Sequence, residues 1–183
     1  EKAAAVCDTL HVFVVEEDAS PIPFAVRYDL VKKGSAHIKN LVYHSSGSYI
    51  ISSATFPSYF LKDSQLVIES QAKLDLMIFT KIAHALNITE RLVGEEPFSE
   101  VTSIYNKIMA KELPAAGIKC TVIPRKTGAD GPISASKVRL ALKEGRLTDI
   151  KAVVPASTYA YFASPEAEPV LAKLRALNDV IHY

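Results

Sequence analysis

The sequence predicts an open α/β fold, with a mostly parallel sheet, helices on both faces of that sheet and a helical C-terminal extension. Four short apolar runs rich in β-branched residues carry the prediction, at 10–15, 40–44, 91–94 and 119–124. Each run is nearly continuously apolar, which is typical of a strand buried on both faces of a parallel sheet. Helical patterns separate the runs, and this alternation favours parallel strands joined by right-handed crossovers.

Segments with apolar residues at helical spacing fill the intervals between these strands and follow the last of them. Four such segments are expected, at 24–33, 74–86, 101–113 and 135–142. The second is the strongest pattern, with one apolar face made of Leu74, Met77, Ile78, Ile82, Ala85 and Leu86. After Gly145 the chain is expected to be wholly helical, over 147–154, 157–162 and 165–180. We therefore predict an α/β domain over 1–145 and a helical extension over 146–183 that packs on the same domain.

Composition and charge exclude several classes of protein. The 183 residues amount to 20.0 kDa, and 49% of them are hydrophobic, which is enough for one globular domain with a real core. Because 21 basic residues balance 20 acidic ones, neither a nucleic acid nor a membrane is expected as a partner. Cys7 and Cys120 lie outside any CxxC spacing, which favours a reducing, cytoplasmic location over a disulfide or zinc scaffold. No apolar run approaches the roughly 20 residues that span a bilayer.

The segment 131–139, GPISASKVR, is the sharpest local signal for chemistry. A glycine turn leads into an amphipathic helix through two hydroxyls, Ser134 and Ser136, and two cations, Lys137 and Arg139. The free N–H groups and positive dipole at such a helix start favour an anion, and the side chains add donors, so the segment could hold phosphate. The alternative is that Ser134 only caps the helix.

Loops at the carboxyl ends of the predicted strands are the other candidates, because ligands of open α/β sheets bind there. These four loops are 16–20, 45–48, 94–98 and 125–128. Gly94, Glu95 and Glu96 suit a ribose, although carboxylates also simply solvate loops. The acidic run 16–18 is interpreted as solvent-facing rather than as a magnesium site, and no metal site is predicted. The hydroxyl-rich segment 45–55 either lines an acceptor pocket or forms a mobile loop.

Familiar phosphate-binding and nucleophile motifs are absent from the sequence. It contains no Walker A sequence, no G-x-G-x-x-G and no G-x-S-x-G elbow, so covalent catalysis by a side chain is not predicted. Cys7 and Cys120 lie on apolar patterns that are typical of small core residues.

Five sequence segments together resemble the catalytic domain of the citrate lyase ligase family. They are VEEDAS at 15–20, RYDLV at 27–31, HSSGSYIISSATFPSYFLK at 44–62, VGEEPF at 93–98 and ISASKVR at 133–139. The likeness runs from about residue 3 to residue 162. The segment 45–62 is the most specific to that family, whereas ISASKVR is the wider signature of the HxGH nucleotidyltransferase superfamily, which includes pantetheine-phosphate adenylyltransferase.

The resemblance implies a Rossmann-like nucleotidyltransferase fold and an acid-thiol ligase activity. ATP and acetate would give acetyl-adenylate and pyrophosphate, with Mg²⁺ as a cofactor. The acetyl group would then pass to the thiol of the phosphoribosyl-dephospho-coenzyme A group on the acyl-carrier subunit of citrate lyase. Two alternatives remain open: another adenylyltransferase of the same superfamily, similar to the phosphopantetheine enzyme, and a non-catalytic nucleotide-binding domain.

The resemblance also implies roles for individual residues. Catalytic roles fall to Ser134, Ser136 and Arg139, and ATP-binding roles to Gly94, Glu95, Ile133, Ser134 and Lys137. The superfamily's first strand and its histidine loop would lie upstream of residue 1. We therefore expect the 183 residues by themselves to be catalytically impaired.

Overall fold

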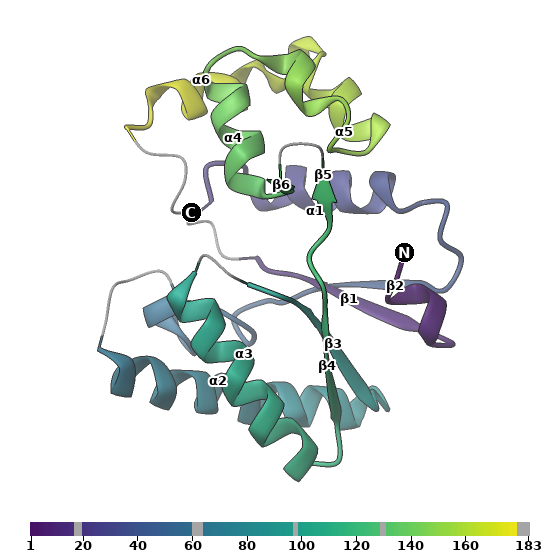
Figure 1. Ribbon diagram of the computed structural model, residues 1–183, viewed down its shortest axis with the longest axis vertical. Helices are drawn as coiled ribbons and strands as arrows, with labels where there is room; N and C mark the ends of the chain where they lie inside the picture. Colours follow the sequence, from purple (N-terminus) through teal and green to yellow (C-terminus); the bar gives the residue numbers. More distant parts are fainter. Residues whose placement is uncertain (17–19, 60–63, 97–98, 129–130, 179–183) are drawn as a thin grey trace. The chain divides into compact units, whose positions relative to one another are not determined.

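A computed structural model describes residues 1–16, 20–59, 64–96, 99–128 and 131–178 (Figure 1). The chain divides into two units. Unit 1 consists of Glu1–Val14, Asp18–Ser45 and Lys126–Tyr183, and unit 2 consists of Val15–Glu17 and Ser46–Arg125. Each unit contains one parallel pair of strands with helices packed in the same unit.

The strand pair of unit 1 is β1 (Leu10–Val14) with β2 (Leu41–Ser45), joined by α1 (Phe24–Gly34). The pairing is parallel and places Leu10 opposite Leu41. A one-turn 3₁₀ helix, η1 (Ala4–Val6), precedes β1, and the short antiparallel strands β5 (Thr127–Gly128) and β6 (Gly131–Pro132) precede α4. The helix α1 ends with Lys32, Lys33 and Gly34, a cationic last turn that suits the helix dipole.

Helices form the remainder of unit 1. They are α4 (Ala135–Lys143), η3 (Leu147–Ile150), α5 (Ala156–Phe162), η4 (Pro165–Ala167) and α6 (Glu168–Ala176). One core cluster joins them, made of the buried residues Ala141, Leu142, Ile150, Phe162, Ala167, Val170 and Leu174. The helix α1 approaches the start of α5 so closely that a Cβ added at Gly34 would lie 2.9 Å from Pro155 Cγ. A glycine is therefore required where α1 meets this segment.

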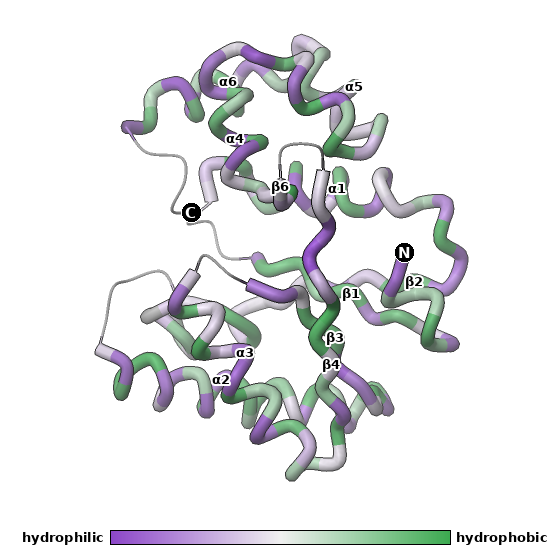
Figure 2. Tube along the Cα trace, viewed as in Figure 1, coloured by the Kyte–Doolittle hydropathy of each residue, from purple (hydrophilic) through white to green (hydrophobic). Residues whose placement is uncertain are grey.

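Unit 2 packs two long helices beside its strand pair (Figure 1). Its elements are η2 (Pro57–Tyr59), α2 (Gln65–Ala85), β3 (Glu90–Gly94), α3 (Glu100–Ala115) and β4 (Lys119–Ile123). The strands β3 and β4 are parallel, and α3 contacts both α2 and β4. Hydrophobic and hydrophilic stretches alternate along α2 and α3, as Figure 2 shows. The inner faces supply the fully or almost fully buried residues Ile68, Ala72, Leu76, Phe79, Ala83, Tyr105, Met109 and Leu113.

The predicted α/β class with parallel strand pairs is confirmed, and each predicted strand lies within one or two residues of its expected position. Beyond Gly145 the described residues form the 3₁₀ turn η3 before α5 and the 3₁₀ turn η4 between α5 and α6, whereas residues 151–155 lie outside any helix, although the helix predicted over 147–154 includes most of them. The β5 and β6 pair was not predicted, because two-residue strands carry no periodic pattern. The division into domains at 1–145 and 146–183 stays a prediction.

The face that α2 buries differs from the predicted one. Met77 and Leu74 are 64% and 47% exposed, although the pattern over 74–86 placed them on the inner face. The helix begins at Gln65, nine residues before Leu74, where the predicted helix begins. The longer stripe through Ile68, Ala72 and Phe79 then defines the buried side. A pattern taken from part of a helix therefore gave the wrong face.

The strands are also less buried than predicted. Among the described strand residues only Val14 is buried, while Val42 and Val122 are 40% and 48% exposed. Within the described residues each long strand has a single hydrogen-bonded neighbour, so none is an interior strand of its sheet. Continuous apolar runs therefore predicted the strands correctly but overstated their burial.

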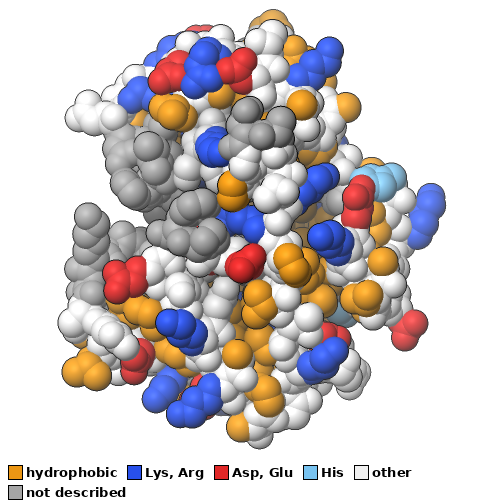
Figure 3. Space-filling model, in the orientation of Figure 1, with side chains coloured by type: hydrophobic (Ala, Val, Ile, Leu, Met, Phe, Trp, Pro, Cys, Tyr) orange, Lys and Arg blue, Asp and Glu red, His pale blue; other side chains and the backbone are white. Residues whose placement is uncertain are grey.

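Two further features concern the surface charge and the hydropathy of the helices. On the face that Figure 3 shows, basic and acidic side chains are interspersed rather than gathered by sign. None of the helices in the described part of the chain combines the length and the apolar character that a membrane-spanning helix needs.

A pair of stacked histidines on the two strands of unit 1 gives a pH-dependent prediction. His11 Nδ1 and His44 Nε2 share a hydrogen bond of 2.9 Å, and Phe13 also stacks on His44 at a centroid distance of 4.7 Å. Burial, and then the charge of His11, lowers the pKa of His44 from its ordinary value of 6.5. The unfolded chain therefore takes up this proton more readily than the folded chain. The contribution to stability is present above about pH 6.5 and is lost as the pH falls through the folded pKa.

We expect His44→Phe to flatten this dependence, because phenylalanine keeps the stacking on Phe13 and does not titrate. Urea unfolding of the native protein and the variant between pH 5 and pH 8 measures the effect. The free energy of unfolding should fall less steeply toward pH 5 in the variant. Equal slopes in the two proteins would contradict the prediction.

Candidate nucleotide-binding site

The start of α4 gathers the hydroxyl and cationic residues that the sequence singled out. Ser134 is the N-cap, and its Oγ accepts a hydrogen bond from the Lys137 N–H at 3.2 Å. This contact confirms that Ser134 caps the helix. A serine hydroxyl also has a proton to donate, so capping leaves it able to bind a phosphate oxygen. The two roles of Ser134 are therefore compatible.

Two cations flank this helix start. Arg139 is 8% exposed, and its Nη2 donates to Ser136 Oγ at 3.3 Å. The Lys137 ammonium lies near the turn before the helix, because a Cβ added at Gly131 would be 4.0 Å from Lys137 Nζ. Gly131 has a φ of 91°, a conformation that other residues rarely adopt. The turn and the helix together present hydroxyls and positive charge at one place.

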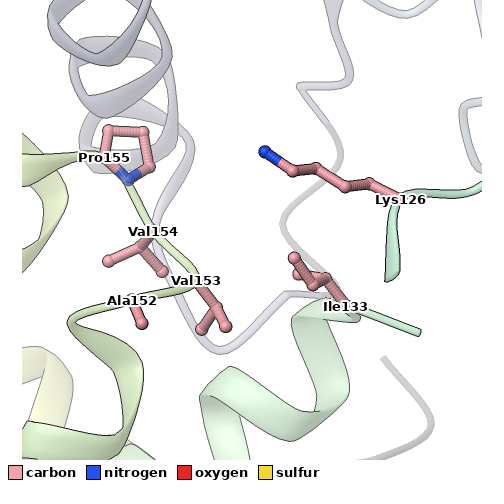
Figure 4. Close-up of a pocket in the computed structure, with 6 residues that line it drawn as sticks. All are labelled: Lys126, Ile133, Ala152, Val153, Val154 and Pro155. Atoms are coloured by element: carbon pink, nitrogen blue, oxygen red, sulfur yellow. The ribbon is translucent and has the colours of Figure 1, made fainter. Parts of the chain in front are cut away.

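A pocket of about 390 Å³ lies beside this helix start, within unit 1. Its lining consists of Lys126, Ile133, Ala152, Val153, Val154 and Pro155. Figure 4 shows Lys126 and Ile133 on one side and the segment 152–155 on the other. The Ile133 N–H donates to the Lys126 carbonyl at 3.1 Å, which fixes this side of the pocket next to Ser134. Five of the six lining residues have apolar side chains and Lys126 adds an ammonium group, while polar and apolar atoms share the walls about equally.

The carboxyl ends of β3 and β4 carry the predicted ribose residues, in unit 2. Gly94 and Glu95 are exposed, and the Glu95 N–H donates to the Ile123 carbonyl at 2.9 Å. Next to them Glu96 forms a half-buried ion pair with Arg125 at 3.0 Å, and its other oxygen accepts from the Ser99 N–H at 3.2 Å. Glu96 therefore connects Arg125, which follows β4, to the N-cap residue of α3, Ser99.

The predicted site residues thus fall into two groups. Ile133, Ser134, Ser136, Lys137 and Arg139 come together in unit 1, whereas Gly94 and Glu95 belong to unit 2. In the acidic run 16–18, residues 17 and 18 lie outside the described residues. Across the described ranges no three His, Cys, Asp or Glu side chains gather as metal ligands do.

Sequence reasoning missed the pocket residues other than Ile133. Lys126 belongs to the loop 125–128 after the fourth predicted strand, but the sequence indicates no role for it. Residues 152–154 fall in the helix predicted over 147–154, and no local signal connects them or Pro155 with Lys126, because the pocket joins parts of the chain that are distant in sequence.

Parallel strand pairs with helical connections, and a helix that opens on hydroxyls and cations, are consistent with an α/β protein of the nucleotidyltransferase-like class. The family model described as the citrate lyase ligase C-terminal domain matches residues 1–162. The chain belongs to this family.

Known relatives agree with the family match. The chain is 44% identical over 167 residues to citrate (pro-3S)-lyase ligase of Escherichia coli, covering 88% of this chain and 47% of that relative. It is 42% identical to the Haemophilus influenzae protein of the same name and 39% identical to that of Klebsiella pneumoniae, covering 50% and 48% of those relatives. The chain thus spans about half the length of the curated relatives it matches.

Proposed function

We propose that the protein containing this chain is an ATP-dependent ligase that acetylates the acyl-carrier subunit of citrate lyase through acetyl-adenylate. Membership of the citrate lyase ligase family, joined to the cluster at the start of α4, carries the proposal. The triphosphate would bind Ser134, Ser136 and the N–H groups of α4, with Lys137 and Arg139 balancing its charge. The base would occupy the adjoining pocket of Lys126 and the segment 152–155.

The first step needs no nucleophilic side chain. A carboxylate oxygen of acetate attacks the α-phosphorus of ATP and forms a new P–O bond. The bond from that phosphorus to the oxygen that bridges to the β-phosphate breaks, and pyrophosphate leaves with the electron pair. The residues at the α4 start act by positioning the phosphates and stabilising the charge on the departing pyrophosphate.

The second step transfers the acetyl group to a thiol. The thiolate sulfur of the phosphoribosyl-dephospho-coenzyme A group attacks the acetyl carbonyl carbon, a thioester forms, and the C–O bond to AMP breaks. The thiol proton passes to solvent.

Gly94 and Glu95 are proposed to lie beside the ribose of the nucleotide.

Magnesium fits this site as a companion of the substrate. Mg²⁺ usually keeps several waters and binds through substrate phosphates together with one or two carboxylates. Because no group of three acidic, histidine or cysteine ligands occurs in the described part of the chain, the ATP phosphates would be its main ligands. The ion would neutralise phosphate charge there.

Pyrophosphate exchange into ATP tests the proposal, with the longest native chain and with the 183 residues alone. Exchange that depends on acetate is the expected result for the native chain. Exchange that ignores acetate and responds to a phosphopantetheine acceptor would replace the proposal with an adenylyltransferase activity. ATP binding without any exchange would indicate a non-catalytic module. Normal turnover by the 183 residues alone would contradict the expectation that they are impaired.

A further inference from the structure

The loop 46–56, which follows β2, buries three of its six hydroxyl side chains. Ser46, Ser52 and Thr55 are only 4–6% exposed. Ser46 Oγ accepts from the Glu16 N–H at 2.9 Å, and the hydroxyls of Ser52 and Thr55 lie 3.1 Å apart. These three hydroxyls therefore fix the loop. They do not line an acceptor pocket, although such a pocket is one of the two interpretations that the sequence allows for 45–55.

Asp75 of α2 accepts hydrogen bonds from this loop. Its side chain is fully buried, and Oδ1 accepts hydrogen bonds from the Ile51 N–H at 2.6 Å and from Thr55 Oγ1 at 2.9 Å. The other oxygen, Oδ2, accepts from the Tyr105 hydroxyl at 2.5 Å. One carboxylate thus connects the loop to both long helices of unit 2.

Arg91 extends this network beyond the Tyr105 hydroxyl. Arg91 Nη2 donates to the Tyr105 hydroxyl at 3.4 Å, and the guanidinium lies 4.2 Å from the centroid of the Phe79 ring. Burial raises the pKa of Tyr105, so its hydroxyl keeps the proton that it donates to Asp75. A buried carboxylate is costly unless hydrogen bonds compensate it, and Asp75 accepts three. The hydrogen bonds of Asp75 therefore hold the loop in one conformation.

The conformation held in this way is an unusual one. Ile51 has a φ of 48°, in the left-handed region that a β-branched residue rarely adopts, and Gly47 has a φ of 53°. Strained backbone of this kind persists only where the surroundings fix it, and it clusters at functional sites. Ile50, next to Ile51, and Phe56 at the end of the loop are both buried, whereas the Tyr49 side chain between Gly47 and Ile50 is 64% exposed.

The chemistry of the loop points to an uncharged ligand. Residues 46–56 contain no Asp, Glu, Lys, Arg or His, so they offer nothing to neutralise a triphosphate. The cations of the candidate ATP site are instead on α4 and the segment before it. An exposed aromatic ring among backbone amides suits an extended arm of apolar and amide groups.

We propose that Asp75 is a positioning residue for the thiol-bearing acceptor, holding loop 46–56 so that Tyr49 contacts the acceptor's uncharged arm. The inference rests on the proposed function. In this arrangement Tyr49 binds the arm, and Asp75 acts only through the backbone of Ile51 and the hydroxyl of Thr55.

The two half-reactions of the full-length native protein separate this role from others. Acetate-dependent pyrophosphate exchange measures adenylate formation, and acetylation of the carrier thiol measures transfer. Asp75→Asn replaces one acceptor oxygen with a donor and should lower kcat/KM for transfer by about 10- to 100-fold, while exchange changes little. Amide hydrogen exchange at Ile51 should become faster in the same variant.

Tyr105→Phe is the matched control, because it removes a hydrogen bond from Asp75 and leaves both contacts of Asp75 with the loop. It should lower the midpoint of thermal unfolding without changing the ratio of transfer to exchange. A structural role alone would give the two variants the same ratio. Equal losses of exchange and transfer in Asp75→Asn would overturn the proposal.

Tyr49→Ala decides the matter if Asp75→Asn fails to fold. We expect KM for the carrier to rise about 10-fold with exchange unchanged, which corresponds to the loss of one good contact. Met77→Ala is its control, since Met77 is also 64% exposed in unit 2 and should leave KM unchanged. An unchanged KM in Tyr49→Ala overturns the inference. A native protein that shows neither exchange nor transfer overturns the proposed function itself, and this inference with it.

Discussion

Replacing Arg139 with alanine is expected to weaken ATP binding by roughly 10- to 100-fold. The guanidinium lies one turn into α4, where it donates to Ser136 Oγ, one of the hydroxyls proposed to bind phosphate. A hydrogen bond to a charged group contributes about 1.5–3 kcal/mol, and this range sets the expected loss. Calorimetric titration of the full-length protein with ATP measures the change in Kd.

Arg146→Ala is the matched control for charge. Its guanidinium is half exposed, in the same unit, and pairs with Glu144 and Asp149 beyond the end of α4. The two variants lose the same formal charge, so a difference in ATP affinity between the folded proteins does not come from net charge. Because Arg139 is buried, thermal unfolding must show that the Arg139 variant is folded. Unchanged affinity in a folded Arg139→Ala protein would remove this residue from the site.

The start of α4 was predictable because its signals are contiguous. A glycine turn, an N-cap serine and an arginine one turn later fall within 131–139, and the structure keeps them together at one helix end. The physical rules for helix starts act over a few residues, so local sequence contains them. The parallel strands were predictable for a similar reason, since each apolar run is short and uninterrupted.

Asp75 shows what local patterns could not supply. An acidic residue in a helix is normally exposed, yet Asp75 is fully buried, because its three donors come from loop 46–56 and from Tyr105 of α3. No spacing along the chain connects these segments. The pocket is a similar case, since Lys126 and the segment 152–155 are brought together only by tertiary packing. Sites formed by distant segments therefore required the structure.

Replacing Leu174 with alanine is expected to cost about 2–5 kcal/mol in the free energy of unfolding. Leu174 of α6 is fully buried in the core cluster of unit 1, where α6 packs on α4. Removing three carbons leaves a cavity that the surrounding helices fill only in part. Urea unfolding of the protein measures the loss. Leu171→Ala is the control, because Leu171 is only partly buried against the same cluster and should cost less.

Because α4 provides Ala141 and Leu142 to that cluster, the same variant also tests whether α6 supports the nucleotide site. A ligand that binds only the folded protein stabilises it by an amount set by its concentration relative to Kd, about 2.7 kcal/mol at 100 times Kd. If α6 only adds stability, ATP should raise the free energy of unfolding equally in the native protein and in Leu174→Ala. If α6 holds α4 in its binding geometry, Kd rises in the variant and the stabilisation by ATP at the same concentration falls. We expect the second result, since the nine-residue helix α4 carries both core residues and residues that we propose to bind the nucleotide.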